Sequence, residues 1–111
     1  MQYLLLIYEN EKRFSQGFDQ AEMNEYDAFG KEFVKSIKGG NALQPTNSAR
    51  TVRVRNGKSS NTDGPFAETK EQLGGYYLVE AGDINEATKM AAKIPGARFG
   101  SVEVRPIMQF S

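Results

Sequence analysis

The chain has 111 residues, 14 of them basic and 14 acidic, and it contains neither cysteine nor histidine. A chain of this length is expected to form one domain, residues 1–111, around a single hydrophobic core, and its zero net charge argues against a nucleic-acid partner. The two missing residue types exclude disulfides, thiolate nucleophiles and a histidine general base, so acid–base chemistry falls to carboxylates, lysines, tyrosines or a bound cofactor.

The N-terminal part of the chain predicts a strand followed by a helix. Residues 3–8 are apolar at both alternating sets of positions, as in a strand that is covered on both faces. This segment starts without basic residues and is too short for a signal sequence or a membrane span, so we expect a soluble cytoplasmic protein with no membrane partner. A helical repeat of apolar residues begins after Asp19, a candidate N-cap with Glu22 at the capping-box spacing, and ends at Gly39-Gly40.

The middle of the chain predicts strands and a hairpin. A short strand is expected at residues 41–44, before Pro45. Residues 51–55 alternate between apolar and basic side chains, and residues 58–62 form the polar return strand. Asn56-Gly57 between them is the strongest short signal for a hairpin turn.

The C-terminal part repeats the order of strand, helix and strand. Residues 75–81 are again apolar on both faces. A helix is expected from Asp83 with the capping-box spacing to Glu86, its inward side chains including Ala87 and Met90, and Pro95-Gly96 ends it. The last strand is expected at residues 101–107.

This order of elements predicts an α+β fold of the ferredoxin-like split βαβ type with an added β-hairpin. Two helices would lie on one face of an antiparallel sheet, which leaves the other face open to water. Because residues 3–8 and 76–79 are apolar on that face too, we expect two chains to bury these faces against each other in a homodimer.

Several blocks of the sequence resemble the DGPF-domain proteins of the YCII-related family. The longest is the run DGPFAETKEQLGGY at residues 63–76, and supporting blocks occur at residues 3–8, 43–45, 52–57 and 102–107. The resemblance implies a dimeric α+β barrel built from two ferredoxin-like protomers, which agrees with the doubly apolar strands. It also implies a possible association with extracytoplasmic-function sigma factors. A histidine–aspartate pair suggested as catalytic in the YCII branch has no counterpart here, because the chain has no histidine.

Residues 63–75 hold the first group of candidate site residues. Asp63 is either an Asx-turn residue or a carboxylate at the mouth of a cleft. Glu68 and Lys70 are either solvated surface charges or an ion pair at the rim of that cleft, where Glu71 would act as a base or a cap. Gly74-Gly75 suggests a close approach of backbones, a positive φ or a β-bulge, and a bulge often redirects side chains beside active sites. The spacing of these carboxylates matches no known metal-binding loop, so we expect no metal.

The second group comes from two alternating segments, residues 52–55 and 102–105. Their valines are expected to face the helices, which places the charged residues Arg53, Arg55, Glu103 and Arg105 on the opposite face. These charges form either a salt-bridge ladder across strands or a site for a small anion, since arginine presents a planar fork to a carboxylate or phosphate. Tyr76 or Tyr77 would supply a hydroxyl there, although buried tyrosines usually serve packing.

Two functions of different classes remain open from the sequence. The first is a small-molecule-binding or regulatory protein, which the family resemblance links to sigma-factor signalling. The second is a cofactor-independent enzyme, isomerase-like or monooxygenase-like, that acts on a small carboxylated or enolisable compound. In that enzyme Asp63 or Glu71 would be the base and Arg53 or Arg105 would hold the anion. We expect no cofactor in either case.

Overall fold

The computed structural model describes residues 1–14 and 17–110. In these residues the order of elements is a strand and a helix, two strand segments with an inserted hairpin between them, and then a helix and a last strand. The elements are β1 (Gln2–Glu9), η1 (Glu11–Phe14), α1 (Gln20–Glu32), β2 (Ile37–Ala42), η2 (Thr46–Ser48), β3 (Arg50–Arg55), β4 (Lys58–Asp63), β5 (Gln72–Glu80), α2 (Ile84–Ala92), η3 (Pro95–Arg98) and β6 (Ser101–Pro106).

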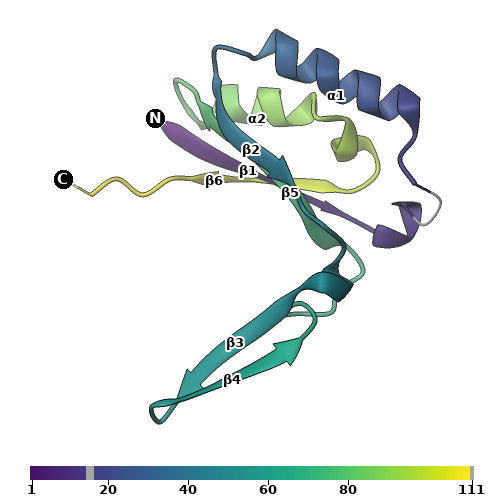
Figure 1. The fold of residues 1–111 in the computed structure, drawn as a ribbon. Coiled ribbons are helices and arrows are strands. Elements are labelled where there is room, and N and C mark those ends of the chain that lie inside the picture. Colours follow the sequence, from purple (N-terminus) through teal and green to yellow (C-terminus); the bar gives the residue numbers. More distant parts are fainter. Residues whose placement is uncertain (15–16, 111) are drawn as a thin grey trace.

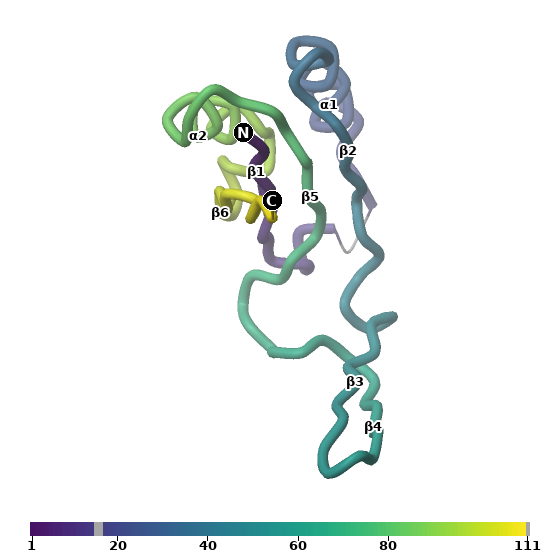
Figure 2. Tube along the Cα trace, turned by 90° about the vertical axis from the view of Figure 1, so that its left-hand side faces the viewer, coloured from purple at the N-terminus to yellow at the C-terminus, as the bar shows by residue number. Residues whose placement is uncertain are grey.

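Four of the strands form one antiparallel sheet in the order β2–β5–β1–β6, and both α-helices cover the same face of it (Figure 1). The view turned by 90° shows α1 and α2 at one end of the molecule and the inserted hairpin at the other, with the strands of the sheet between them (Figure 2). This is the ferredoxin-like split βαβ arrangement, so the predicted fold class is confirmed. Among the described residues, no helix has the length and apolar content needed to cross a membrane.

The core lies between the helices and this sheet. Along β1 the side chains of Tyr3, Leu5 and Ile7 are buried, and the residues between them are only half-buried. This strict alternation arises because successive side chains of a strand point to opposite faces. The remaining buried apolar residues come from α1, β5, α2 and the segments beside α2: Phe29, Val79, Ala81, Ala87, Met90, Ala91 and Ile94.

The first helix is shorter than the sequence predicted. Asp19 caps it as expected, accepting a hydrogen bond from the Ala21 amide at 3.1 Å, but the helix ends at Glu32. Gly39 and Gly40 lie inside β2, which begins at Ile37, earlier than the predicted strand. The predicted helix was too long because the apolar spacing continues across the turn at residues 33–36.

The second helix agrees with its prediction. The Asp83 side chain accepts a hydrogen bond from the Glu86 amide, and the Glu86 carboxylate accepts one from the Gly82 amide, both at 2.8 Å. The buried residues of α2 include Ala87 and Met90, as their spacing predicted. The helix ends at Ala92, before the single 3-10 turn that starts at Pro95.

The inserted β3–β4 hairpin, residues 50–63, forms a separate two-stranded sheet that we call the arm. Its predicted turn is confirmed, since Asn56 and Gly57 both have positive φ, 53° and 75°. The prediction that Val52 and Val54 face the helices is wrong: both are exposed, by 63% and 59%. The alternation in residues 51–55 showed which side chains share a face, but it held no information on what lies against that face.

The glycine pair at the start of β5 forms the predicted bulge. Ile7 pairs with Gly75 and Tyr8 pairs with Leu73, so Gly74 is an extra residue without a partner on β1. The freed Gly74 carbonyl accepts a hydrogen bond from the Leu43 amide at 2.9 Å. The bulge therefore ties the chain after β2 to the start of β5, next to the base of the arm.

Candidate functional site

The face of the four-stranded sheet that turns away from the helices carries an apolar centre with polar rims, and we call it the open face. The strand register places Leu78, Leu4 and Arg105 side by side across β5, β1 and β6, and it places Tyr76, Leu6 and Glu103 in the next row. Tyr8 follows on β1, on the same face as Leu4 and Leu6. The leucines are only half-buried within one chain.

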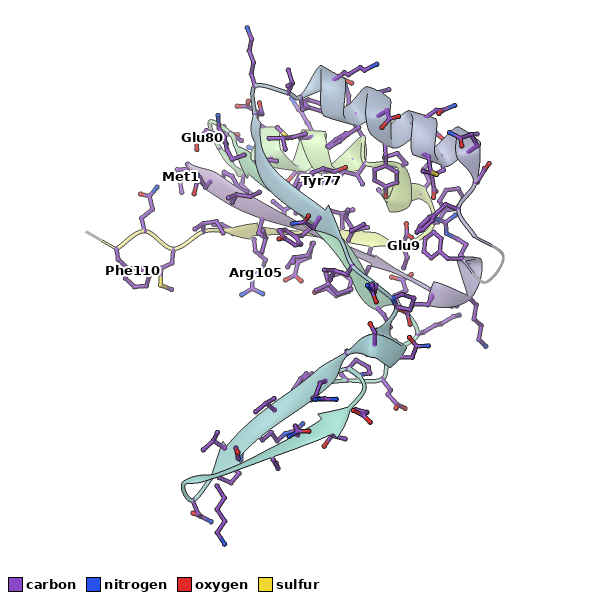
Figure 3. All side chains as sticks on the ribbon, viewed as in Figure 1. Met1, Glu9, Tyr77, Glu80, Arg105 and Phe110 are labelled. Carbon is purple, nitrogen blue, oxygen red and sulfur yellow. The ribbon has the colours of Figure 1, made fainter. Side chains whose placement is uncertain are left out.

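The β6 rim of the open face is formed by three polar side chains that are linked by hydrogen bonds. The Tyr8 hydroxyl donates a hydrogen bond to the Glu103 carboxylate at 3.2 Å, and the Arg105 guanidinium donates to the other oxygen of that carboxylate at 3.3 Å. Burial raises the pKa of the Tyr8 phenol, and the hydrogen bond to the Glu103 carboxylate raises it further. Figure 3 shows Arg105 on the side of the sheet away from the helices. The rim thus combines a protonated phenol, a carboxylate and a guanidinium.

The opposite rim, on β2, carries a second polar contact. The Asn41 side-chain amide donates a hydrogen bond to the Tyr76 hydroxyl at 3.1 Å. Tyr76 and Glu103 flank Leu6 in the register, which separates them by two strand spacings, or about 10 Å. An apolar strip about as wide as one aromatic ring therefore lies between the two rims.

Glu71 lies at the end of the open face beside Tyr8. Its carboxylate accepts a hydrogen bond from the Ser101 hydroxyl at 2.9 Å, and Ser101 is the residue that pairs with Tyr8 on β6. Of the predicted site residues, the structure thus brings Glu71, Tyr76, Glu103 and Arg105 to one face of the sheet.

The other predicted site residues lie on the arm or just after it. Arg53 lies over the Phe66 ring, 5.7 Å from its centre, on an arm strand that does not pair with β6. The ladder or anion site that would join Arg53 and Arg55 to Glu103 and Arg105 is therefore not formed between the described residues of one chain. The reason is that, within residues 1–14 and 17–110, β3 pairs with β4 alone and β6 pairs with β1 alone.

Asp63 ends the arm, with its side chain 87% exposed and 3.5 Å from Arg50. Glu68 and Lys70 are exposed in the segment that leads to β5, and the ion pairs of residues 1–14 and 17–110 do not include one between them. The structure therefore does not bring Asp63, Glu68 and Lys70 together into the predicted cleft rim.

A buried cluster of charges was not predicted from the sequence. The Arg13 guanidinium contacts the buried carboxylate of Glu22 at 2.9 Å and that of Glu9 at 3.3 Å, and it lies against the Phe99 ring, 4.0 Å from the ring centre. Burial raises the pKa of the Glu9 carboxyl, and the neighbouring Arg13 counteracts part of that increase. Glu22 therefore pairs with Arg13 and does not complete the predicted capping box.

This cluster fastens the first helix to the sheet. Glu9 is at the end of β1 and Glu22 is in α1, so Arg13 connects the two elements from the segment between them. Beside it, the Tyr26 hydroxyl accepts a hydrogen bond from the Gly96 amide at 3.2 Å. One signal for the cluster was present in the sequence, because Glu9 continues the buried alternation of Tyr3, Leu5 and Ile7. The contact between Arg13 and Glu22 was not predicted because the two residues are nine positions apart in the sequence.

Comparison with known proteins agrees with this fold. The chain is similar, with a TM-score of 0.58 and 14% identity, to 5-chloro-2-hydroxyhydroquinone dehydrochlorinase from Burkholderia phenoliruptrix AC1100, solved in complex with 2,5-dihydroxybenzoquinone; 99% of this chain and 96% of that chain are covered. At this identity the likeness shows the fold alone.

Similarity in sequence defines the family. The chain is 38% identical over 114 residues to an uncharacterized protein of Rhizobium meliloti (strain 1021), with 96% of this chain and 92% of the relative covered. The model of the YCII-related domain matches residues 1–111. The chain therefore belongs to the YCII-related family.

Proposed function

We propose that this protein binds a small organic molecule on the open face of its sheet, where a second copy of the chain covers the site. The observation that carries the proposal is the hydrogen-bonded chain of Tyr8, Glu103 and Arg105 beside the half-buried leucines. Ligand sites of this size combine an apolar wall with a few convergent polar groups, and the open face has both.

The chemistry of the face favours a flat, acidic ligand. The leucines offer an apolar wall about 10 Å wide between the rims, which suits a single ring. The Arg105 guanidinium suits a carboxylate or an enolate, because its planar fork matches two oxygens of such an anion. A ligand of this kind would take the place of the Glu103 carboxylate on Arg105, or bind to its free edge.

A second copy is part of the proposal because the open face is apolar without being covered by its own chain. Leu4, Leu6 and Leu78 are half-buried in the protomer, and covering the open face would add the remaining part of the roughly 1.5–3 kcal/mol that full burial of an exposed leucine contributes. A regulatory role with a sigma factor as partner stays a prediction, since it depends on the family resemblance.

A second candidate function is a cofactor-independent enzyme acting on a small enolisable compound. The arrangement that favours it is a phenol with two carboxylates nearby. The Tyr8 hydroxyl is hydrogen-bonded to Glu103, and Glu71 is hydrogen-bonded to Ser101, the residue that pairs with Tyr8. Glu71 would remove a proton from the carbon next to a carbonyl, and Arg105 would stabilise the enolate that forms. Asp63 stays an alternative base, predicted from the sequence.

Thermal unfolding in the presence of 2,5-dihydroxybenzoquinone and benzoate tests the binding proposal. These probes match the proposed ligand class, and the first is the ligand of the structurally similar dehydrochlorinase. Arg105→Gln should abolish any ligand-induced rise in the melting temperature. Arg98→Gln is the matched control, because Arg98 is also an exposed arginine paired with a glutamate, but on the helix side. An equal rise in both variants would reject the open face as the site.

Proton exchange tests the enzymatic candidate. The wild type should speed the exchange of carbon-bound protons of an enolisable probe such as acetophenone carboxylate in deuterated water, and Glu71→Gln should abolish the acceleration. Glu68→Gln, five residues into the same connecting segment, is the control. Unchanged exchange in Glu71→Gln would remove Glu71 from the mechanism and leave the binding function standing.

A further inference from the structure

The arm has an apolar side that its own chain leaves uncovered. Val52 and Val54 alternate with Thr51 and Arg53 along β3, so both valines lie on one side of the arm. They are exposed by 63% and 59%, and every residue of β4 is exposed as well. Figure 1 shows the arm extending away from the helices, on the side of the sheet where the open face lies.

The base of the arm is closed by hydrogen bonds between its two ends, and its outer part is an isolated ribbon. At the base, the Gly64 amide donates to the Ala49 carbonyl at 2.8 Å, and the Thr51 hydroxyl donates to the Gly64 carbonyl at 3.0 Å. Beyond that point, β3 and β4 pair only with each other. A lone two-stranded hairpin is marginally stable in water, so a ribbon with an apolar side gains stability from a surface that covers it.

The charges of the chain are divided between the arm and the remainder. Residues 50–63 hold four basic residues and one acidic residue, which gives the arm a net charge of +3. The chain has 14 of each, so the remainder holds ten basic and thirteen acidic residues, with a net charge of −3. Outside its own arm, a second copy of the same chain therefore carries a net charge equal and opposite to that of the arm, which favours association of the two.

The dimensions of the arm match the open face. Each arm strand has six residues, about 20 Å of extended chain, and the four strands of the sheet span about 15 Å from β2 to β6. An arm laid across the strands thus reaches over the whole apolar centre. Contact between two copies is also reciprocal, because each has one arm and one open face, and a closed two-fold dimer satisfies both.

We propose that the arm of each protomer packs across the open face of a second copy, with Val52 and Val54 against Leu4, Leu6 and Leu78 of the partner subunit. This inference rests on the proposed function, because it identifies which part of the second copy covers the ligand site. It makes the arm one wall of that site.

Sedimentation at micromolar concentration tests the exchange of arms. The wild type should be a dimer, and the double variant Val52→Asp, Val54→Asp should lose the dimer while its circular dichroism stays unchanged, since neither valine contacts the core. Val34→Asp is the matched control, as Val34 is 66% exposed in the turn after α1. This control should remain a dimer. A dimeric double variant would overturn the proposal.

A cysteine experiment tests the same contact without relying on that variant. The natural chain has no cysteine, so Val54→Cys and Leu6→Cys each introduce a single one. When the two proteins are mixed and oxidised, they should form a disulfide-linked pair, and Val54→Cys mixed with Thr88→Cys on α2 should not. Equal cross-linking in both mixtures would overturn the proposal.

The outcomes separate this inference from the proposed function. A wild-type dimer that binds 2,5-dihydroxybenzoquinone, with the double aspartate variant still dimeric, overturns the arm contact and keeps the binding function. A dimer that depends on the arm but binds neither probe supports the contact and counts against the function. A monomeric wild type whose arm binds labelled duplex DNA overturns the inference, because the basic arm would then serve a phosphate backbone.

Discussion

The hydroxyl of Tyr8 donates a hydrogen bond to the carboxylate of Glu103 at 3.2 Å, joining residues 95 positions apart in the chain. The bond crosses from β1 to β6 on the open face, where the register brings Tyr8 next to Ser101 and Leu6 next to Glu103. It places an ionisable phenol and an acid within reach of one ligand, which is the chemistry on which both candidate functions depend.

The Tyr8 phenol should ionise more easily when the Glu103 charge is removed. Its pKa is raised first by burial and then by the Glu103 carboxylate, which favours the protonated phenol. Glu103→Gln should therefore lower the pKa of one tyrosine toward 10.0, its ordinary value, without reaching it, because burial remains. The change is measured by ultraviolet titration of the phenolates.

Two further variants make that titration specific. Tyr8→Phe should remove the transition that Glu103→Gln shifts. Glu80→Gln changes an exposed glutamate that pairs with the N-terminal amine, and it should leave all tyrosine transitions in place. Superimposable titration curves for the wild type and Glu103→Gln would contradict the hydrogen bond.

Replacing Arg13 should destabilise the fold more than any exposed ion pair does. Arg13→Met leaves the carboxylates of Glu9 and Glu22 buried without a partner, which costs about 3 kcal/mol of unfolding free energy, the lower end for breaking a buried ion pair. Lys93→Met breaks the exposed pair with Glu32 and should cost less than about 1 kcal/mol. Urea unfolding measures both values, and equal losses would contradict a structural role for the cluster.

The pH dependence of stability should carry the signature of Glu9. Its pKa is raised above the ordinary 4.5, so the folded protein binds this proton more tightly than the unfolded chain does. The stabilisation linked to that proton is fully present below pH 4.5 and is lost as the pH rises through the raised pKa.

Glu9→Gln removes this titration. The unfolding free energy of the variant minus that of the wild type should therefore increase as the pH rises from about 4 to about 7. Urea unfolding at a series of pH values measures the difference. A difference that stays constant, or falls, over this range would show that the Glu9 pKa is not raised in the folded protein.

Two adjacent glycines of β2 should respond differently to alanine. A Cβ atom at Gly40 would lie 2.5 Å from the Tyr76 carbonyl oxygen, whereas one at Gly39 meets nothing within 4 Å. Gly40→Ala should therefore cost about 1–3 kcal/mol, the usual range for forcing extra volume into a packed site, and Gly39→Ala much less. Thermal unfolding of both variants checks the close approach of β2 to β5, and equal stability would contradict it.

The parts of the fold that the sequence predicted are those governed by local rules. The alternation of residues 3–8 assigns Tyr3, Leu5 and Ile7 to one face, and the cap at Asp83 and the turn at Asn56-Gly57 act within a few residues. The end of α1 was missed because the apolar spacing continues past Glu32. The exposure of Val52 and Val54 was missed because it depends on where the hairpin lies.

The candidate site was predicted in part for the same reason. Tyr76, Arg105 and Glu71 were named from their positions in strands or beside the glycine pair, and the structure places them on or at the end of the open face. Tyr8 was passed over although it alternates with Leu4 and Leu6. Its partner on β6 is distant in sequence, so no local pattern pointed to the hydrogen bond.

The central claim is that a second copy of the chain covers the apolar open face. Methyl NMR of the leucines in the presence of a paramagnetic agent dissolved in the solvent tests it directly, because the agent broadens only the methyl groups that it can approach. Two leucines calibrate the measurement, since Leu5 is fully buried in one chain and Leu43 is 44% exposed. The signals of Leu4, Leu6 and Leu78 should stay as sharp as that of Leu5. Broadening of these three as strong as that of Leu43 would show an uncovered face and contradict the account.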